Sequence, residues 1–136
     1  MMLRILPLLL GLMAGAVHAE VAVIVHPGNA AALSSDDIQK LFLGKIKSFP
    51  AGGEATPVNL KEGSAVREQF NQGLLGKSES QVKAYWSQLV FTGKGTPPKE
   101  LDNDEAVKAF VASTPAGVGY IDASKVDGTV KVVLKQ

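Results

Sequence analysis

The sequence has 136 residues, of which 14 are Lys or Arg, 13 are Asp or Glu and none is Cys. A chain of this length supports one hydrophobic core but not two, and its balanced charge gives no bulk attraction to nucleic acid or to an anionic membrane. The absence of cysteine excludes a disulfide framework, a thiolate metal site and a lipid-modified N-terminal cysteine. Stability must therefore come from the packed core.

Residues 1–19 have the pattern of a secretory signal peptide. Arg4 supplies the positive charge, an apolar stretch follows, and Val-His-Ala at residues 17–19 forms a small-residue cleavage site. The apolar stretch is shorter than the roughly 20 residues that a membrane-spanning helix needs, although an uncleaved anchor stays open as the alternative. We expect cleavage after Ala19, export to the periplasm or the medium, and a soluble single domain over residues 20–136 without membrane insertion.

The first part of the expected domain predicts a strand and then a helix. The run Val21–Val25 is apolar and rich in β-branched residues, which is typical of a buried strand. Ser34 and Asp37 have the spacing of a capping box at a helix start, and Gly44 suits the left-handed residue that ends a helix. The apolar residues at helical spacing between them are Ile38, Leu41 and Phe42.

The rest of the chain alternates short strands with capped helices. Further strands are predicted over 57–60, 118–121 and 129–134, and further helices from Ser64 to Gly76, from the Ser78 and Gln81 capping box to Val90, and from Asp102 with Glu105 to the residue before Pro115. This alternation predicts an α/β fold with a mixed or mostly parallel sheet of about four strands flanked by about four helices. The expected core contains the two terminal strands together with Ile38, Leu41, Phe42, Phe70, Leu74, Leu89 and Phe110.

Three segments of the sequence resemble a known family in the same order along the chain. They are residues 33–50 with the run Leu-Gly-Lys-Ile-Lys at 43–47, residues 57–64 with Glu-Gly-Ser at their end, and residues 114–121 with Pro-Ala-Gly-Val-Gly-Tyr-Ile. Together they resemble periplasmic phosphate-binding proteins, the soluble receptors of phosphate ABC transporters. Such receptors have two lobes with the ligand between them. The resemblance therefore implies a short, single-lobe relative with a type II periplasmic-binding-protein-like fold.

The turn into the second predicted helix is the candidate ligand site. A helix start presents unpaired amides and the positive end of the helix dipole, which suits phosphate or a similar oxyanion. The candidate residues are Lys61, Gly63, Ser64, Ala65, Val66 and Arg67. The alternative from the residues alone is that Ser64 is an N-cap and nothing more. Gly63 and Ser64 match the glycine and serine of the family's phosphate loop, whereas Leu60 stands at its arginine, and Ala65 and Val66 stand at its later glycine and threonine.

Other residues predict no catalytic chemistry and no metal or cofactor site. His26 has no second histidine or nearby carboxylate at metal-ligand spacing. Asp36 lies in a first helical turn, where the dipole favours it. Gly93-Lys94-Gly95 is typical of a surface loop, and Lys45 follows a helix end, where cations are favoured. We therefore expect a protein that is not an enzyme.

Two hypotheses for the function follow. In the first, the chain is an exported solute-binding module of the phosphate-receptor type that binds an oxyanion weakly and works with an ABC transporter permease or another envelope protein. In the second, it is a non-catalytic interaction module that keeps the receptor-lobe scaffold and docks a partner, or a second copy in a homodimer, through the former ligand-cleft face. The retained Gly63 and Ser64 favour the first hypothesis, and Leu60, Ala65 and Val66 favour the second.

Overall fold

A computed structural model describes residues 20–136 of the chain. The predicted signal peptide lies outside the described residues. Within them, no helix combines the length and the apolar character needed to cross a membrane.

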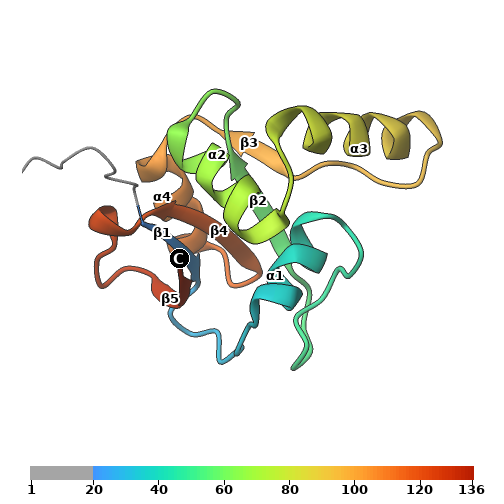
Figure 1. The fold of residues 1–136 in the computed structure, drawn as a ribbon. Helices are drawn as coiled ribbons and strands as arrows, with labels where there is room; N and C mark the ends of the chain where they lie inside the picture. The colour runs from blue at the N-terminus through green and yellow to red at the C-terminus, as the bar shows by residue number, and fades with distance from the viewer. Residues whose placement is uncertain (1–19) are drawn as a thin grey trace, which may run out of the picture.

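The described residues form one five-stranded sheet with helices packed on both faces (Figure 1). The strand order across the sheet is β3-β2-β4-β1-β5. β2 pairs in parallel with β3 and β4, and β1 pairs antiparallel with β4 and β5. The strands are β1 (Val21–Val25), β2 (Thr56–Leu60), β3 (Lys99–Leu101), β4 (Gly117–Asp122) and β5 (Lys131–Lys135). The predicted α/β fold with a mixed sheet is confirmed, and β3 is an additional short edge strand.

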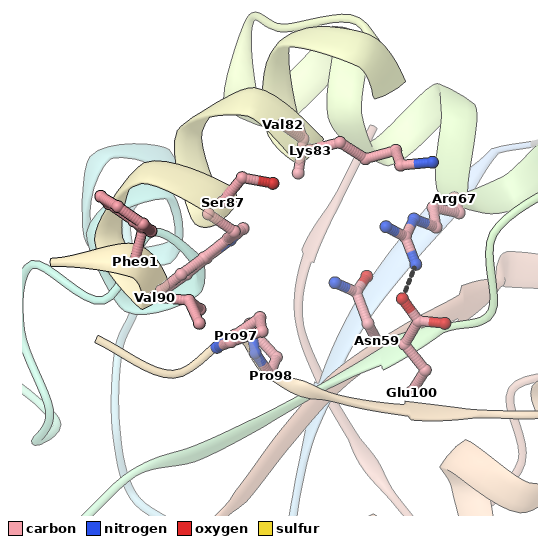
Figure 2. A pocket seen from close by; sticks show the side chains of 11 residues that line it. Asn59, Arg67, Val82, Lys83, Ser87, Val90, Phe91, Pro97, Pro98 and Glu100 are labelled. Atoms are coloured by element: carbon pink, nitrogen blue, oxygen red, sulfur yellow. Dashed lines mark hydrogen bonds and ion pairs between the residues drawn. The ribbon is translucent and has the colours of Figure 1, made fainter. Parts of the chain in front are cut away.

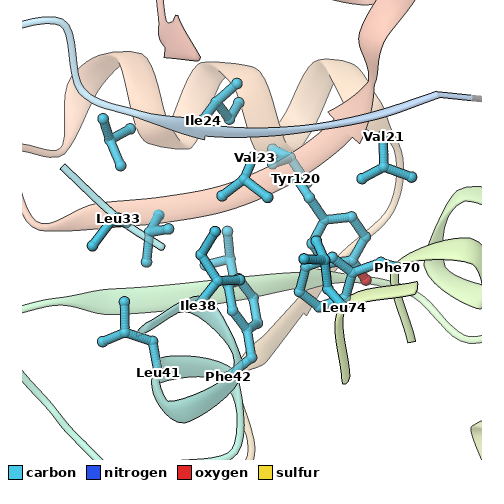
Figure 3. Packing of buried hydrophobic residues seen from close by; sticks show 14 of the residues in the cluster. Val21, Val23, Ile24, Leu33, Ile38, Leu41, Phe42, Phe70, Leu74 and Tyr120 are labelled. Atoms are coloured by element: carbon cyan, nitrogen blue, oxygen red, sulfur yellow. The ribbon is translucent and has the colours of Figure 1, made fainter. Parts of the chain in front are cut away.

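Each face of the sheet carries its own helices. α1 (Ser35–Phe42) and α2 (Ala65–Phe70), which continues into the π-helical turn η1 (Asn71–Leu75), cover one face, and α4 (Asp104–Ser113) covers the other. Because side chains alternate along a strand, Val21 and Val23 of β1 point toward α2 while Ile24 points to the opposite side (Figure 3). The remaining elements are α3 (Glu79–Phe91) and the 3₁₀ turn η2 (Ala123–Lys125).

Aromatic rings form the centre of the core on the α1 and α2 face. Phe70 stacks on Tyr120 with ring centroids 3.8 Å apart, and Phe42 meets Phe70 edge-on at 4.8 Å. Ile38 and Leu41 of α1 are buried beside them, as predicted (Figure 3). This cluster fixes α1 and α2 against the sheet and so sets the position of the turn that precedes α2.

The local signals in the sequence place most helix ends correctly. Ser34 and Ser78 both form the predicted capping boxes, Ser64 caps α2, and Gly44 adopts a left-handed φ of 72° after α1. The start of α4 differs from the prediction, because the N-cap is Asn103, whose side chain accepts from the Ala106 N–H at 2.9 Å.

Two residues expected in the core, Phe110 and Leu89, are only partly buried at its margin. On α4, Val107 and Val111 are the residues that point into the sheet, and both are completely buried. This orientation places Phe110 at the side of the helix, where it lies over Gly117. β5 is also only partly buried, because it is the other edge strand of the sheet.

α3 differs from the other helices because it projects from the body of the molecule (Figure 1). Only two of its residues, Val82 and Trp86, are buried. Val90 and Phe91 at its C-terminal end are 53% and 91% exposed. The helix is therefore held mainly through Val82 and Trp86 and leaves an apolar end in contact with solvent.

Candidate functional site

The predicted oxyanion turn between β2 and α2 has the conformation that its residues suggest. Gly63 adopts a φ of +98°, a conformation that L-residues rarely adopt. The Ser64 N–H donates to the Lys61 carbonyl at 3.3 Å, which closes the turn. The Ser64 hydroxyl accepts from the Arg67 N–H at 3.2 Å, so this side chain is an N-cap.

The donors that this turn leaves available are few. The N–H groups of Ala65 and Val66 are first-turn amides that the helix itself does not use, and the Ser64 hydroxyl still has its own proton to donate. Lys61 is exposed on the same turn. Space beside Gly63 is open, since a Cβ built there would meet no atom within 4 Å. The turn is therefore a shallow, solvent-open cradle.

Arg67 does not add its charge to this cradle. Its side chain is only 5% exposed, and its guanidinium donates to both carboxylate oxygens of Glu79 at 2.8 and 2.9 Å. It also donates to Glu100 and to the Leu60 carbonyl, each at 2.8 Å. Burial acts against the charged form, but the hydrogen bonds that Arg67 donates to Glu100 and Glu79 outweigh it and raise the pKa of Arg67. The arginine therefore ties α2, α3 and β3 together.

Leu60 and Tyr120 complete the buried surroundings of the turn. The Leu60 side chain is buried, so the residue at the position of the family's arginine is part of the core. Its N–H donates to the Tyr120 hydroxyl at 3.3 Å, and that hydroxyl donates to the side-chain oxygen of Asn59. Burial raises the pKa of Tyr120, which keeps the phenol neutral as a donor.

Three of the secondary candidates have structural roles, and the fourth, Lys45, is only an exposed residue. The His26 ring nitrogen Nδ1 accepts from the Gly28 N–H at 3.0 Å in a turn. The amides of Gly93 and Lys94 donate to carbonyls at the end of α3, so they cannot form an anion cradle. Asp36 pairs with Lys40 one helical turn away, and Lys45 is an exposed surface residue.

A cavity that sequence reasoning missed lies beside the oxyanion turn, between α3 and the edge of the sheet (Figure 2). Its volume is about 490 Å³, within the range of small-molecule sites. Asn59, Arg67 and Glu100 lie at its polar end, and Val90, Phe91 and Pro97 lie toward the other. The only signal of this cavity in the sequence is that α3 ends in two adjacent apolar residues, Val90 and Phe91. Adjacent residues of a helix point in different directions, so a single apolar face does not need both.

Comparisons with solved structures identify the class of protein that shares this fold. A phosphate ABC transporter substrate-binding protein from Clostridium perfringens with bound phosphate matches with a TM-score of 0.67 and 24% identity, over 85% of this chain and 45% of that one. An ABC-type phosphate transport receptor from Vibrio cholerae matches with a TM-score of 0.65 and 19% identity, over 85% and 46%. PstS from Borrelia burgdorferi matches with a TM-score of 0.62 and 13% identity, over 85% and 47%.

The predicted resemblance to phosphate ABC transporter substrate-binding proteins is therefore confirmed at the level of the fold. The chain spans less than half the length of these solved relatives, as expected of a single-lobe relative. No model of a protein family matches the sequence, and a comparison with curated proteins finds no significant match.

Proposed function

We propose that this chain is an exported solute-binding module that binds phosphate or a similar oxyanion at the turn before α2. The observation that carries the proposal is the geometry of this turn. The space beside the Gly63 backbone is open, and the amides of Ala65 and Val66 remain available beside the Ser64 hydroxyl. The fold shared with phosphate receptors supports it. Lys61, rather than Arg67, is then the nearby positive charge.

The proposed binding is weak for two physical reasons. The anion would be covered on one side only, so water and salt screen its interactions with the turn. The one arginine near the turn is already engaged by Glu79 and Glu100. We therefore expect a Kd between roughly micromolar and millimolar for phosphate. A permease or another envelope protein that covers the open side would tighten this binding.

Calorimetric titration of the chain from Glu20 onward with phosphate and sulfate tests this proposal. Ser64→Asp should weaken binding by more than about tenfold, because aspartate preserves the N-cap but places a negative charge beside the anion. Ser78→Asp is the matched control, since Ser78 caps α3 in the same way, and it should leave the affinity unchanged. Equal affinities for all three proteins would place any anion elsewhere.

One observation favours the second hypothesis, a non-catalytic interaction module. Phe91 is 91% exposed and Val90 is 53% exposed at the projecting end of α3. Surface apolar residues that adjoin an apolar cavity are typical of sites where another protein docks. If a second copy docks there, sedimentation velocity should reveal a dimer whose population falls in Phe91→Ser. If the protein is a monomer at all concentrations and the calorimetric titration with phosphate shows heat of binding, the oxyanion module remains the function.

A further inference from the structure

A single buried amide faces the cavity between α3 and the sheet edge. Asn59 is 92% buried, with a relative exposure of 8%. Its side-chain oxygen accepts the Tyr120 hydroxyl proton, and the Tyr120 oxygen in turn accepts from the Leu60 N–H. The Tyr120 hydroxyl has one proton and donates it to the Asn59 oxygen, so the nitrogen of this amide points away from Tyr120.

The Asn59 amide nitrogen is consequently the group turned toward the cavity (Figure 2). Its two N–H donors find no acceptor among residues 20–136. The nitrogen is open to the cavity, so a bound acceptor would replace water as its hydrogen-bond partner. The hydrogen bonds from Leu60 through Tyr120 also polarise the amide and strengthen it as a donor. The structure thus presents a preformed hydrogen-bond donor at the floor of the cavity.

The walls around this amide are largely apolar. Val82 and Trp86 of α3 form one side, and Pro97 and Pro98 of the segment before β3 form the other. Val82 and Trp86 are buried, at 3% and 7% exposure, so the wall that they form is held in place. The apolar part of a ligand that lies between these two walls would remove their surface, and its own, from water. Burial of apolar surface supplies most of the affinity in sites of this kind.

The charges at the polar end select the kind of acceptor. Arg67 is neutralised by Glu79 and Glu100, and Lys83 is paired with Glu62 at 3.0 Å. Glu100 lies beside Asn59 with its side chain 49% exposed (Figure 2), so its negative charge faces the same space. A carboxylate ligand would meet this like charge, whereas an uncharged carbonyl oxygen would not.

We propose that this cavity is a binding site for a small molecule that combines an apolar body with an uncharged carbonyl oxygen, such as a primary amide. The apolar body lies between Trp86 and the two prolines, and the carbonyl oxygen accepts from the Asn59 amide. This site is separate from the proposed oxyanion turn, and neither depends on the other. The chain then binds two chemically distinct ligands, a neutral solute in the cavity and an anion at the turn.

The isosteric pair 3-phenylpropanamide and 3-phenylpropanoate tests the selectivity. Trp86 is the only tryptophan in the chain, so its fluorescence reports occupancy of the cavity directly. The amide should produce a saturable change and bind at least about tenfold more tightly than the carboxylate. Equal affinities, or no saturable change with either compound, would overturn the proposal. Added phosphate should leave both titrations unchanged, which separates this test from that of the oxyanion turn.

Two variants distinguish the Asn59 hydrogen bond from nonspecific apolar contact. Asn59→Leu removes both N–H donors without adding a charge, and it should weaken binding of the amide by about tenfold. Ser87→Phe fills the cavity from its lining on α3 and should abolish binding, whereas Gln88→Phe on the neighbouring exposed position should not. Far-ultraviolet circular dichroism checks that each variant is folded. An unchanged affinity for the amide in a folded Asn59→Leu protein would contradict the assignment.

Discussion

α2 and α3 have the same types of residue at their two ends but differ in how deeply the fold buries them. Each begins at an N-cap serine, Ser64 or Ser78, and each ends in a phenylalanine. Phe70 at the end of α2 is 1% exposed, whereas Phe91 at the end of α3 is 91% exposed. Local sequence therefore decides where these helices begin and end, and the sheet decides which of them is buried.

The two helices also differ in how they use charge. Arg67 of α2 is buried and engaged by Glu79 and Glu100, whereas Lys83 of α3 pairs with Glu62 at the surface, with the two side chains 58% and 50% exposed. The guanidinium of Arg67 thus stabilises the fold rather than a ligand at the proposed oxyanion turn. The surface that remains open to ligands on α3 is apolar.

The largest expected effect separates the two terminal phenylalanines. Phe70→Ala should lower the free energy of unfolding by about 3–5 kcal/mol, because it removes a ring stacked on Tyr120 in the centre of the core. Phe91→Ala should change it by less than about 0.5 kcal/mol, as for other exposed positions. Urea unfolding measures both. Similar losses for the two variants would mean that α3 packs more closely than the structure describes.

The next largest effect separates the two ion pairs. Arg67→Ala should cost about 3 kcal/mol, near the lower end for a broken buried pair, because Glu79 and Glu100 retain partial contact with water. Lys83→Ala should cost less than about 1 kcal/mol, as exposed pairs do. The same unfolding experiment compares them. A loss below about 1 kcal/mol for Arg67→Ala would show that its guanidinium is free to serve a ligand.

The smallest effect concerns the two N-caps. Ser64→Ala and Ser78→Ala should each cost about 1 kcal/mol of stability, with the larger loss at Ser78 because Gln81 completes a reciprocal capping box there. In phosphate titrations only Ser64→Ala should weaken binding, by about tenfold or more, for the loss of one hydrogen bond to a charged group. If both variants bind phosphate equally, Ser64 is an N-cap only.

Local signals in the sequence were sufficient for much of the fold. Ser34, Ser64 and Ser78 were identified as caps because capping depends on residues three positions apart. The paired glutamates of Arg67 could not be identified in this way, since Glu79 and Glu100 follow it by 12 and 33 residues. The sequence therefore predicts Arg67 as a ligand contact beside the expected anion site, whereas the tertiary structure pairs it with these two glutamates.

Local sequence signals also fail to predict the edge of the sheet and the adjoining cavity. β3 comprises only Lys99–Leu101, and its two charged residues give no strand pattern. Without β3, the cavity between it and α3 could not be anticipated, nor could the burial of Asn59, whose partner Tyr120 lies 61 residues away. Periodicity also placed Phe110 in the core, whereas Val107 and Val111 occupy the inward face of α4.

The most direct test of the central claim is a phosphate titration followed by ¹H–¹⁵N NMR spectroscopy. Each backbone amide is observed separately, so the start of α2 and the end of α3 are compared in one experiment. We expect saturable shifts at the amides of Ala65 and Val66, with little change at Val90 or Phe91. Shifts confined to α3, or no saturable shift in a folded protein at millimolar phosphate, would contradict binding of the oxyanion at the Gly63–Ser64 turn.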